Sequence, residues 1–311
     1  MNNKKPSILV IGDIILDHYL SGITNRISPE APVPIVDCVS EKWVLGGAAN
    51  VANNLVSIGA QVTLAGIVGD DENGNLVKRL ILSKNIYNQI FISKNRKTTI
   101  KSRIISSHHQ LLRIDKEDKY FISNDEELEI INSIILNIKN FNCIIISDYS
   151  KGLLTNNLIK KIIEISSEHN IKVLIDPKSP PFSKYSGAYL IKPNRKEALL
   201  ETGIDIVDEN TFSHAAHLIQ ETTSCEAVVI TLSEDGVGLY DKKINKILPT
   251  NAKDIFDVTG AGDTFIATLA YALAIGKSLV ESCELANYAS GVVVGKHGCV
   301  VIEYKDIESI I

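Results

Sequence analysis

The residues around position 260 combine a flexible backbone with an acid. Gly260 and Gly262 flank Ala261, and Asp263 follows directly, ahead of an apolar stretch over residues 265–275. The two glycines allow consecutive backbone N–H groups to point at one anion, and a following helix adds the positive end of its dipole. A carboxylate at this point can accept the proton of a hydroxyl that attacks a phosphoryl group. The segment predicts a phosphoryl-transfer site with Asp263 as general base; the alternative is a tight turn in which Asp263 only favours the helix N-terminus.

The pair Gly46 and Gly47 marks a second place where a ligand can approach the main chain. Glycine has no side chain, so a sugar-sized molecule can lie close to the backbone there. Asn50 lies in a predicted helix over residues 48–58 and can both donate to and accept from hydroxyl groups. The pattern favours a sugar site, and the alternative is a helix of small residues that packs closely against a neighbour.

A third candidate, residues 194–197, places an amide and a carboxylate three residues apart, and its members are Asn194, Arg195, Lys196 and Glu197. The preceding Pro193 predicts a helix start, so Asn194 and Glu197 share one face. An amide oxygen and a carboxylate, acting through water, suit a Mg²⁺ ion that also binds phosphates. The same spacing is typical of a capping box, which is the structural alternative.

The elements that must position these residues alternate along the chain. Apolar runs typical of buried parallel strands lie at 8–12, 62–68, 143–147, 172–175 and 227–232. Helical patterns lie between and after them, at 48–58, 73–83, 125–138, 156–168, 210–222, 261–275 and 280–294. This alternation predicts a parallel sheet with helices on both faces and ligands beyond the carboxyl ends of its strands. Four polar residues follow strands and are expected on that rim: Asp13, Asp148, Asp176 and Thr231.

Two stretches interrupt the alternation. Residues 18–45 contain three prolines within seven positions, which permit only an edge strand or an extended loop. Residues 87–115 alternate apolar and polar side chains and indicate antiparallel strands outside the main sheet. Together they predict a small β lid over the rim of one α/β domain that spans residues 1–311.

The composition excludes several classes of protein. The 311 residues are 45% hydrophobic and 22% charged, which is typical of a globular protein. With 32 Lys and Arg against 37 Asp and Glu, the net charge of −5 argues against general binding to nucleic acid or to an anionic membrane. The five cysteines form no C-x-x-C pair, so we expect reduced and mostly buried thiols. No apolar run is long enough for a signal peptide or a membrane span, and we expect a cytoplasmic protein.

In their order along the chain, these segments resemble the signatures of the ribokinase-like PfkB family of carbohydrate kinases. Residues 46–50 match the first signature, residues 257–265 match the more specific second one, and 66–74, 194–197 and 231–236 agree as well. The resemblance covers essentially the whole chain. It implies a three-layer α/β/α fold with a mostly parallel central sheet and a β lid, and ATP-dependent phosphorylation of a sugar with Mg²⁺.

Within that family the chain is most similar to the D-glycero-β-D-manno-heptose 7-phosphate kinases, through residues 12–17, 26–34, 147–152 and 176–178. The resemblance implies phosphorylation of the anomeric 1-hydroxyl to the 1,7-bisphosphate, a step toward ADP-heptose for the lipopolysaccharide core. No nucleotidyltransferase segment follows in this sequence, so we expect a monofunctional kinase, and the resemblance implies a homodimer formed through the lid. A ribokinase, fructokinase or nucleoside kinase, or a non-catalytic sugar-binding protein on the same scaffold, is the alternative.

The resemblance also implies a role for each motif residue. Asp263 would be the general base, and the amides of Gly260, Ala261 and Gly262 would bind the transferred phosphoryl group. The nucleotide would lie near Asn194, Arg195, Lys196, Glu197, Thr231, Ser233 and Gly236, with Asn194 and Glu197 holding Mg²⁺. The sugar hydroxyls would meet Asp13, Asp17, Gly46, Gly47 and Asn50. Anionic groups would meet Lys151, Lys178, Arg26 and Arg103, and for each of the two lysines an exposed surface charge is the alternative. Three serines depart from the pattern where glycine is expected: Ser150, Ser179 and Ser233.

Overall fold

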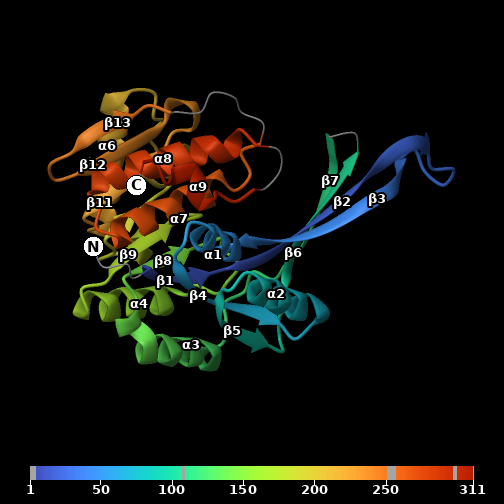
Figure 1. Cartoon of the computed structure of the whole chain (residues 1–311), viewed down its shortest axis with the longest axis horizontal. Coiled ribbons are helices and arrows are strands. Elements are labelled where there is room, and N and C mark those ends of the chain that lie inside the picture. The colour runs from blue at the N-terminus through green and yellow to red at the C-terminus, as the bar shows by residue number, and fades with distance from the viewer. Residues whose placement is uncertain (1–4, 107–108, 251–256, 297–299, 311) are drawn as a thin grey trace.

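The computed structural model describes residues 5–106, 109–250, 257–296 and 300–310, and a nine-stranded sheet forms its centre (Figure 1). Its strands lie in the order β13 (Asn245–Leu248), β12 (Val237–Asp241), β11 (Ala227–Thr231), β10 (Leu190–Ile191), β9 (Lys172–Asp176), β8 (Cys143–Ser147), β1 (Ser7–Gly12), β4 (Gln61–Gly69) and β5 (Tyr87–Ser93). Neighbours from β11 to β5 run parallel, whereas β12 and β13 form an antiparallel edge. The mostly parallel sheet that the sequence predicts is therefore confirmed.

Helices cover both faces of this sheet because its central strands are apolar on both sides. Along β1, Ile8 and Val10 lie in one hydrophobic core, and Leu9 and Ile11 lie in the other. The first core is closed by α1 (Ala48–Ser57), α2 (Glu72–Ser83), α7 (Ala261–Ala274) and α8 (Leu279–Val294). The second is closed by α3 (Asn124–Asn137), α4 (Asn156–Glu168), α5 (Arg195–Thr202) and α6 (Glu209–Thr223). Short helical segments complete the fold: η1 (Ile138–Asn140), η2 (Phe182–Tyr185), η3 (Ser233–Asp235) and α9 (Tyr304–Ile307).

A separate four-stranded sheet, which we call the lid, projects from the body as two long arms and a shorter hairpin (Figure 1). Its strands lie in the order β3 (Pro34–Gly47), β2 (Ile14–Ile27), β6 (Thr99–Ser106) and β7 (His109–Lys116). Only β2 and β6 run parallel to each other. The proline-rich stretch ends at Pro34, where the edge strand β3 begins, as the lack of an N–H on proline requires.

One expected part of the lid lies elsewhere. Residues 87–93 form β5, which pairs in parallel with β4 at the edge of the main sheet rather than with the lid strands. The prediction of lid strands over all of 87–115 is wrong for this segment. An edge strand is half-exposed, so its alternation of polar and apolar residues looks the same in either sheet.

Two further expectations concern the cysteine thiols and membrane-spanning segments. The thiols of Cys143, Cys225 and Cys283 are free and buried, Cys38 is free and exposed, and Cys299 lies outside the described residues. Among the helices that the structure describes, none combines the length and apolar character needed to cross a membrane.

Candidate active site

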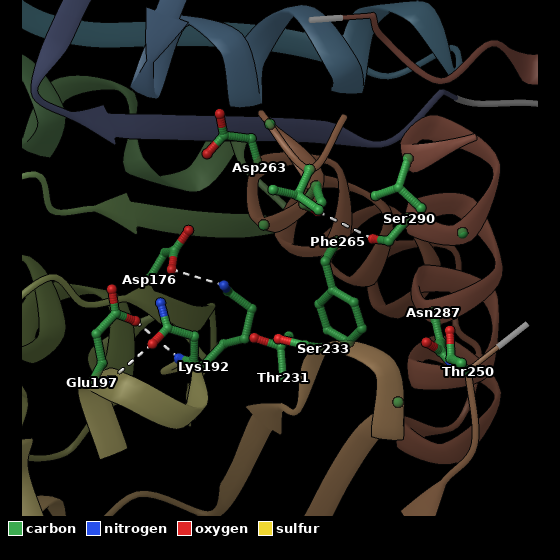
Figure 2. A pocket seen from close by; sticks show the side chains of 18 of the residues that line it. Asp176, Lys192, Glu197, Thr231, Ser233, Thr250, Asp263, Phe265, Asn287 and Ser290 are labelled. Carbon is green, nitrogen blue, oxygen red and sulfur yellow. Dashed lines mark hydrogen bonds and ion pairs between the residues drawn. The ribbon is translucent and has the colours of Figure 1, made fainter. Parts of the chain in front are cut away.

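A cavity of about 550 Å³ opens at the carboxyl ends of the parallel strands, beside the first turn of α7 (Figure 2). This is the rim on which the sequence predicts polar residues after the strands, and three of them line the cavity: Asp148, Asp176 and Thr231. The cavity is also lined by residues predicted to bind the nucleotide, Mg²⁺ or anionic groups and by the predicted phosphoryl-transfer residues: Lys178, Asn194, Glu197, Ser233, Gly236, Gly260, Ala261, Gly262 and Asp263. Residues more than 80 positions apart in the sequence thus face one space.

Asp263 lies in the first turn of α7 and is buried, with 7% of its surface exposed. Asn50 donates to Oδ2 of this carboxylate over 2.6 Å, and the Tyr149 hydroxyl donates to Oδ1 over 2.5 Å. Burial raises the pKa of Asp263, and although these two hydrogen bonds and the charge of Lys192 lower it, the net pKa stays above its ordinary value. The carboxylate is therefore oriented from both sides before any substrate arrives.

The turn before Asp263 exposes the N-terminus of α7 to the cavity. Gly260 has φ 82°, a left-handed conformation that glycine adopts without strain, and it lets the chain turn into α7. Lys192 lies across this turn, since a Cβ on Gly262 would be 3.6 Å from its Nζ. The N-terminus of α7, its helix dipole and one ammonium group thus converge on one space, which favours an anion there, although the N–H of Ala261 already donates to the Val258 carbonyl over 3.2 Å.

Lys192 is almost completely buried and forms an ion pair with Asp176 over 2.9 Å (Figure 2). Burial lowers the pKa of Lys192, but the charges of Asp176, Glu197 and Asp263 outweigh this, so the net pKa is raised. The side chain consequently stays protonated at neutral pH. The sequence contains no signal for this role, because Lys192 is one of many lysines until the sheet places it beside residue 176.

Asn194 and Glu197 form the capping box of α5. The Asn194 side chain accepts from the N–H of Glu197, and the Glu197 carboxylate accepts from the N–H of Asn194, each over 2.9 Å. Glu197 also pairs with Lys178 over 3.2 Å. The capping box, which the spacing of these two residues also predicts, is therefore present, and both side chains still line the cavity.

This pair fits a Mg²⁺ ion held mainly by other ligands. Within the described residues no group of three or more His, Cys, Asp or Glu side chains could hold a metal alone. A carboxylate oxygen accepts more than one contact, so Glu197 has room for a metal-bound water beside its present partners. Mg²⁺ usually keeps several waters and binds through one or two carboxylates and substrate phosphates, which this donor set allows.

The two residues between Asn194 and Glu197 do not line the cavity. Arg195 donates to the Leu232 carbonyl over 3.1 Å and pairs with Asp235 on η3, so it supports the loop after β11. Neither Arg195 nor Lys196 lines the cavity, although the resemblance implies a place for both near the nucleotide.

The loop after β11 supplies the opposite wall of the cavity. Thr231 ends β11, and Ser233 follows with φ 56°, the left-handed conformation that a glycine at this position would adopt without strain. Gly236 has φ 95°, and a Cβ there would be 2.1 Å from the Leu248 carbonyl oxygen. Only glycine fits at position 236, so this turn is fixed by its backbone.

The lid side of Asp263 carries a second group of predicted residues. Asp17 on β2 pairs with Arg103 on β6 over 2.5 Å, and both side chains are largely buried. Gly46 lies against this pair, since a Cβ on it would be 2.1 Å from Asp17 Oδ2. Gly47 has φ 57° and directly precedes α1, the helix that carries Asn50. The structure therefore groups Asp17, Gly46, Gly47 and Asn50 where the lid joins the body.

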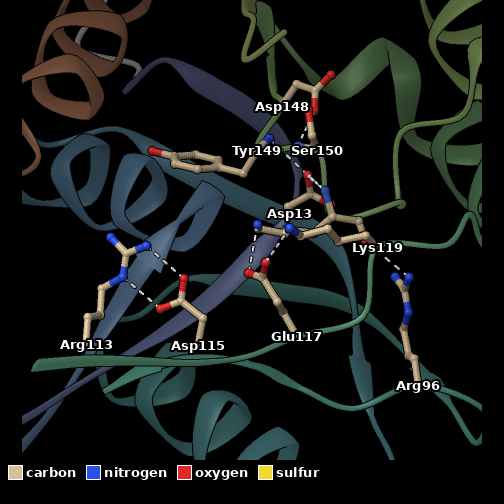
Figure 3. A network of polar contacts seen from close by, with 10 residues as sticks. Asp13, Arg96, Arg113, Asp115, Glu117, Lys119, Asp148, Tyr149 and Ser150 are labelled. Carbon is tan, nitrogen blue, oxygen red and sulfur yellow. Dashed lines mark hydrogen bonds and ion pairs between the residues drawn. The ribbon is translucent and has the colours of Figure 1, made fainter. Parts of the chain in front are cut away.

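Asp13 and Lys151 have other partners in this structure (Figure 3). Asp13 Oδ2 accepts from the N–H groups of Tyr149 and Lys151 over 2.9 and 3.0 Å, and its Oδ1 accepts from Leu153 over 3.3 Å. Burial and the charge of Asp148 raise the pKa of Asp13 to about 6. Lys151 pairs with Glu117 over 2.7 Å. These contacts hold the loop after β8 in place, and neither residue lines the cavity.

Arg26 does not join either group. Its guanidinium lies on the outer half of β2, is 66% exposed and meets Asp37 on β3 over 3.5 Å. Residues that sequence reasoning missed lie closer: Tyr149, which contacts Asp263, and Lys101 on β6, whose ammonium lies 5.9 Å from the centre of the Tyr149 ring. Both depend on contacts between distant segments, so no local pattern could identify them.

Comparison with known proteins identifies relatives over nearly the whole chain. Residues 5–304 match the family described as pfkB family carbohydrate kinase. The chain is 50% identical over 305 residues to the bifunctional protein HldE of Sulfurimonas denitrificans, covering 97% of this chain and 64% of that protein. It is 45% identical over 308 residues to HldE of Aliarcobacter butzleri, covering 99% of this chain and again 64% of the relative. The chain thus spans about two thirds of the length of these curated relatives.

Solved structures support the same fold. Phosphofructokinase-2 from Escherichia coli in complex with potassium superposes with a TM-score of 0.82 at 19% identity, over 98% of this chain and 97% of that one. Ribokinase from Arabidopsis thaliana, complexed with ribose and ATP, superposes with a TM-score of 0.78 at 19% identity, over 99% of both chains. With the family match over residues 5–304, the chain belongs to the pfkB family of carbohydrate kinases, enzymes that transfer phosphate from ATP to a sugar.

Proposed function

We propose that this kinase phosphorylates the anomeric 1-hydroxyl of D-glycero-β-D-manno-heptose 7-phosphate, giving the 1,7-bisphosphate on the way to ADP-heptose and the lipopolysaccharide core. The observation that carries the proposal is the position of Asp263. It lies between the cavity of about 550 Å³ on one side and the Asp17 and Asn50 group at the lid on the other. A sugar bound against the lid and a nucleotide in the cavity would meet at this carboxylate.

The chemistry follows from that position. The 1-hydroxyl oxygen forms a bond to the γ-phosphorus of ATP, the bond between that phosphorus and the ADP oxygen breaks, and the Asp263 carboxylate takes the hydroxyl proton. The amides of Gly260, Ala261 and Gly262, together with Lys192, stabilise the negative charge on the transferred group. A Mg²⁺ ion near Asn194 and Glu197 would supply further neutralisation of phosphate charge.

Nucleotide contacts are assigned from the cavity walls. One wall of the cavity is the end of β11 and the loop after it, with Thr231, Ser233 and Gly236. Lys178 also lines the cavity and pairs there with Glu197. An ammonium group paired with a single carboxylate at the edge of the cavity can exchange that partner for a phosphate oxygen. We assign Lys178 to the nucleotide phosphates on this ground.

A group of four cations supports a phosphorylated sugar as the acceptor: Lys101, Arg103, Arg113 and Lys151. By strand pairing, Lys101 on β6 lies on the same face of the lid as Asp17, and Arg103 and Arg113 lie on that face one position further out. Three of the cations pair with carboxylates, namely Arg103 with Asp17, Arg113 with Asp115 and Lys151 with Glu117. Burial and the charge of Lys151 lower the pKa of Lys101, and the charges of Asp17 and Asp115 oppose this without outweighing it. The group thus has one cation more than carboxylates, which suits the distal 7-phosphate.

The lid also supports self-association. Its other face carries an apolar strip, since Leu20, Ile104 and Leu112 pair across three strands, and Leu112 and Ile114 are about half exposed. A thin sheet with an uncovered apolar face gains stability when a second copy covers it. We therefore assign a homodimer formed through the lid, and a cytoplasmic setting in which ATP and sugar phosphates are present.

A comparison of acceptors tests the proposal. ADP release is measured with heptose 7-phosphate, unphosphorylated heptose, ribose, fructose and adenosine at equal concentrations. We expect the highest kcat/KM for heptose 7-phosphate and a large loss when its phosphate is absent. Preference for an unphosphorylated sugar or for adenosine would assign the protein to another kinase of the family. Binding of sugar without any ADP release would indicate the non-catalytic alternative.

A further inference from the structure

The carboxylate of Asp263 is held by two donors from opposite sides. Asn50 reaches Oδ2 from α1, and the Tyr149 hydroxyl reaches Oδ1 from the loop after β8. The oxygen–oxygen distance of the Tyr149 hydrogen bond, 2.5 Å, is typical of a hydroxyl that donates to a charged carboxylate. Each oxygen keeps a lone pair for a further donor, so neither contact blocks an incoming hydroxyl.

Tyr149 is itself fixed at its backbone. The Asp13 carboxylate accepts from the N–H of Tyr149 and from that of Lys151, and Figure 3 shows Asp13 at the backbone end of Tyr149. The next residue, Ser150, has φ 55° and donates its N–H to Asp148 over 2.7 Å. Two buried carboxylates thus hold the turn that aims the phenol at Asp263.

The protonation state of Tyr149 makes it a donor only. Burial raises its pKa well above 10, and the negative charge of Asp263 raises it further, so the hydroxyl stays protonated at any working pH. A neutral donor at this distance favours the charged form of the carboxylate over the neutral form. Four other charged groups act on Asp263 or Tyr149: Asp17 on β2, Lys101 on β6, Asp176 on β9 and Lys192 after β10.

We propose that Tyr149 is a positioning residue for the base: its hydroxyl keeps the buried Asp263 charged and oriented for the acceptor hydroxyl. The inference rests on the proposed role of Asp263. It explains what opposes the burial of this carboxylate, which raises its pKa and so favours the neutral form. Tyr149 acts through Asp263 and has no assigned contact with the substrate.

The test replaces only the hydroxyl. Tyr149→Phe keeps the ring and removes the donor, so the pKa of Asp263 must rise. We expect the acid limb of kcat to move up by about 1–2 pH units, the effect of one charged hydrogen bond. At high pH, where Asp263 is ionised in both proteins, kcat is expected to recover to within about tenfold of the wild type.

A second readout needs no sugar. Aspartate labelled with ¹³C at the side-chain carboxyl is followed by NMR over pH, and the Asp263→Asn variant assigns the signal. We expect the Asp263 titration in Tyr149→Phe to shift upward by the same amount as the kinetic limb. The kinetic profile is recorded with whichever sugar the wild type phosphorylates.

The matched control is Thr155→Val. Thr155 precedes α4 and donates its hydroxyl to the buried carboxylate of Glu127, away from the cavity, so this variant loses the same kind of bond at a different acid. We expect lower thermal stability and no movement of the acid limb. An unmoved NMR titration in Tyr149→Phe overturns the inference. A moved titration with an unmoved kinetic limb overturns Asp263 as the base instead.

Discussion

Asp263 is the residue on which the proposed chemistry depends, and its replacement separates catalysis from binding. Asp263→Asn keeps the size of the side chain and removes its ability to take a proton. We expect kcat to fall about 10²–10⁴-fold, the usual contribution of a general base. The dissociation constant of ATP, measured by calorimetry, should change little, because the cavity walls at Ser233 and Gly236 are untouched.

Asp241→Asn is the control for this change. Asp241 ends β12 and uses its carboxylate to accept from backbone N–H groups of Lys243 and Ile244, away from the cavity. It should leave kcat unchanged. Turnover near the wild-type value in Asp263→Asn would show that another group takes the proton.

Lys101 tests the proposed site for the distal phosphate. Lys101→Met keeps most of the side-chain length and removes the ammonium group that lies 5.9 Å from the centre of the Tyr149 ring. Loss of one charged contact to phosphate should raise KM for heptose 7-phosphate about 10–100-fold. The effect should be small with unphosphorylated heptose, and steady-state kinetics with both sugars measures the difference.

Lys116→Met is the matched variant on the other face of the lid. Lys116 pairs with Ile100, so it lies one position along the lid from Lys101 and on the opposite face. It should leave both KM values unchanged. Equal losses in the two variants would mean that general lid charge, not a phosphate contact, is being measured.

The sequence predicts single residues well where chemistry and backbone geometry coincide. Asp263 and the glycines before it are such a place, because the left-handed conformation at residue 260, with φ 82°, favours a glycine that can be recognised in the sequence. Tyr149 and Lys192 could not be predicted, since their roles arise from contacts 114 and 16 positions away along the chain. Asp13 is the opposite case. The sequence identifies it as a candidate for binding the sugar, but in the structure its carboxylate accepts from backbone N–H groups of the loop after β8.

At the scale of elements, the end of β3 is fitted to β2. Gly46 lies opposite Ile15, and the space for its missing Cβ is filled by the carboxylate of Asp17. In Gly46→Ala this carboxylate must rotate away, since its end is the flexible part of the contact. We expect KM for the sugar to rise about tenfold or more, the loss of one charged contact, with a thermal midpoint close to the wild type.

The control for Gly46→Ala lies on the same strand. Val39→Ala changes an exposed side chain in the outer half of β3, and sugar kinetics should not respond. An unchanged KM in Gly46→Ala, measured alongside it, would show that Asp17 does not contact the sugar.

Helices and buried strands could be placed from periodicity, but edge strands could not. The apolar run before Asp13 is buried on both faces, which only a central strand permits. By contrast, β5, β12 and β13 are partly exposed, and β10 has only two residues. Their positions are decided by pairing with neighbours, which the sequence does not encode locally.

At the scale of the whole molecule, the lid predicts the oligomeric state. The double variant Leu112→Glu with Ile114→Glu places charges on the apolar face of β7, opposite to the face that carries Asp17. We expect the wild type to sediment as a dimer and the variant as a monomer, because burying unpaired carboxylates is unfavourable. Analytical ultracentrifugation over a range of concentrations measures this.

Leu136→Glu controls for the effect of a new surface charge. Leu136 lies on α3 and is 83% exposed, far from the lid strands in the fold (Figure 1). It should remain dimeric. A wild type that is monomeric at all concentrations, or a double variant that stays dimeric, would contradict the lid interface.

The way in which the lid strands β2 and β3 join the body has a thermodynamic consequence. Only Asp13 separates β1 from β2, and β3 passes directly into α1 at Gly47, so the two long arms begin at the residues assigned to the sugar. Bending these arms displaces Asp17 and Gly46 as well. If one arm angle is favoured by pairing with a second copy, occupancy of the sugar site and association of copies become reciprocal, each changing the other by the same factor.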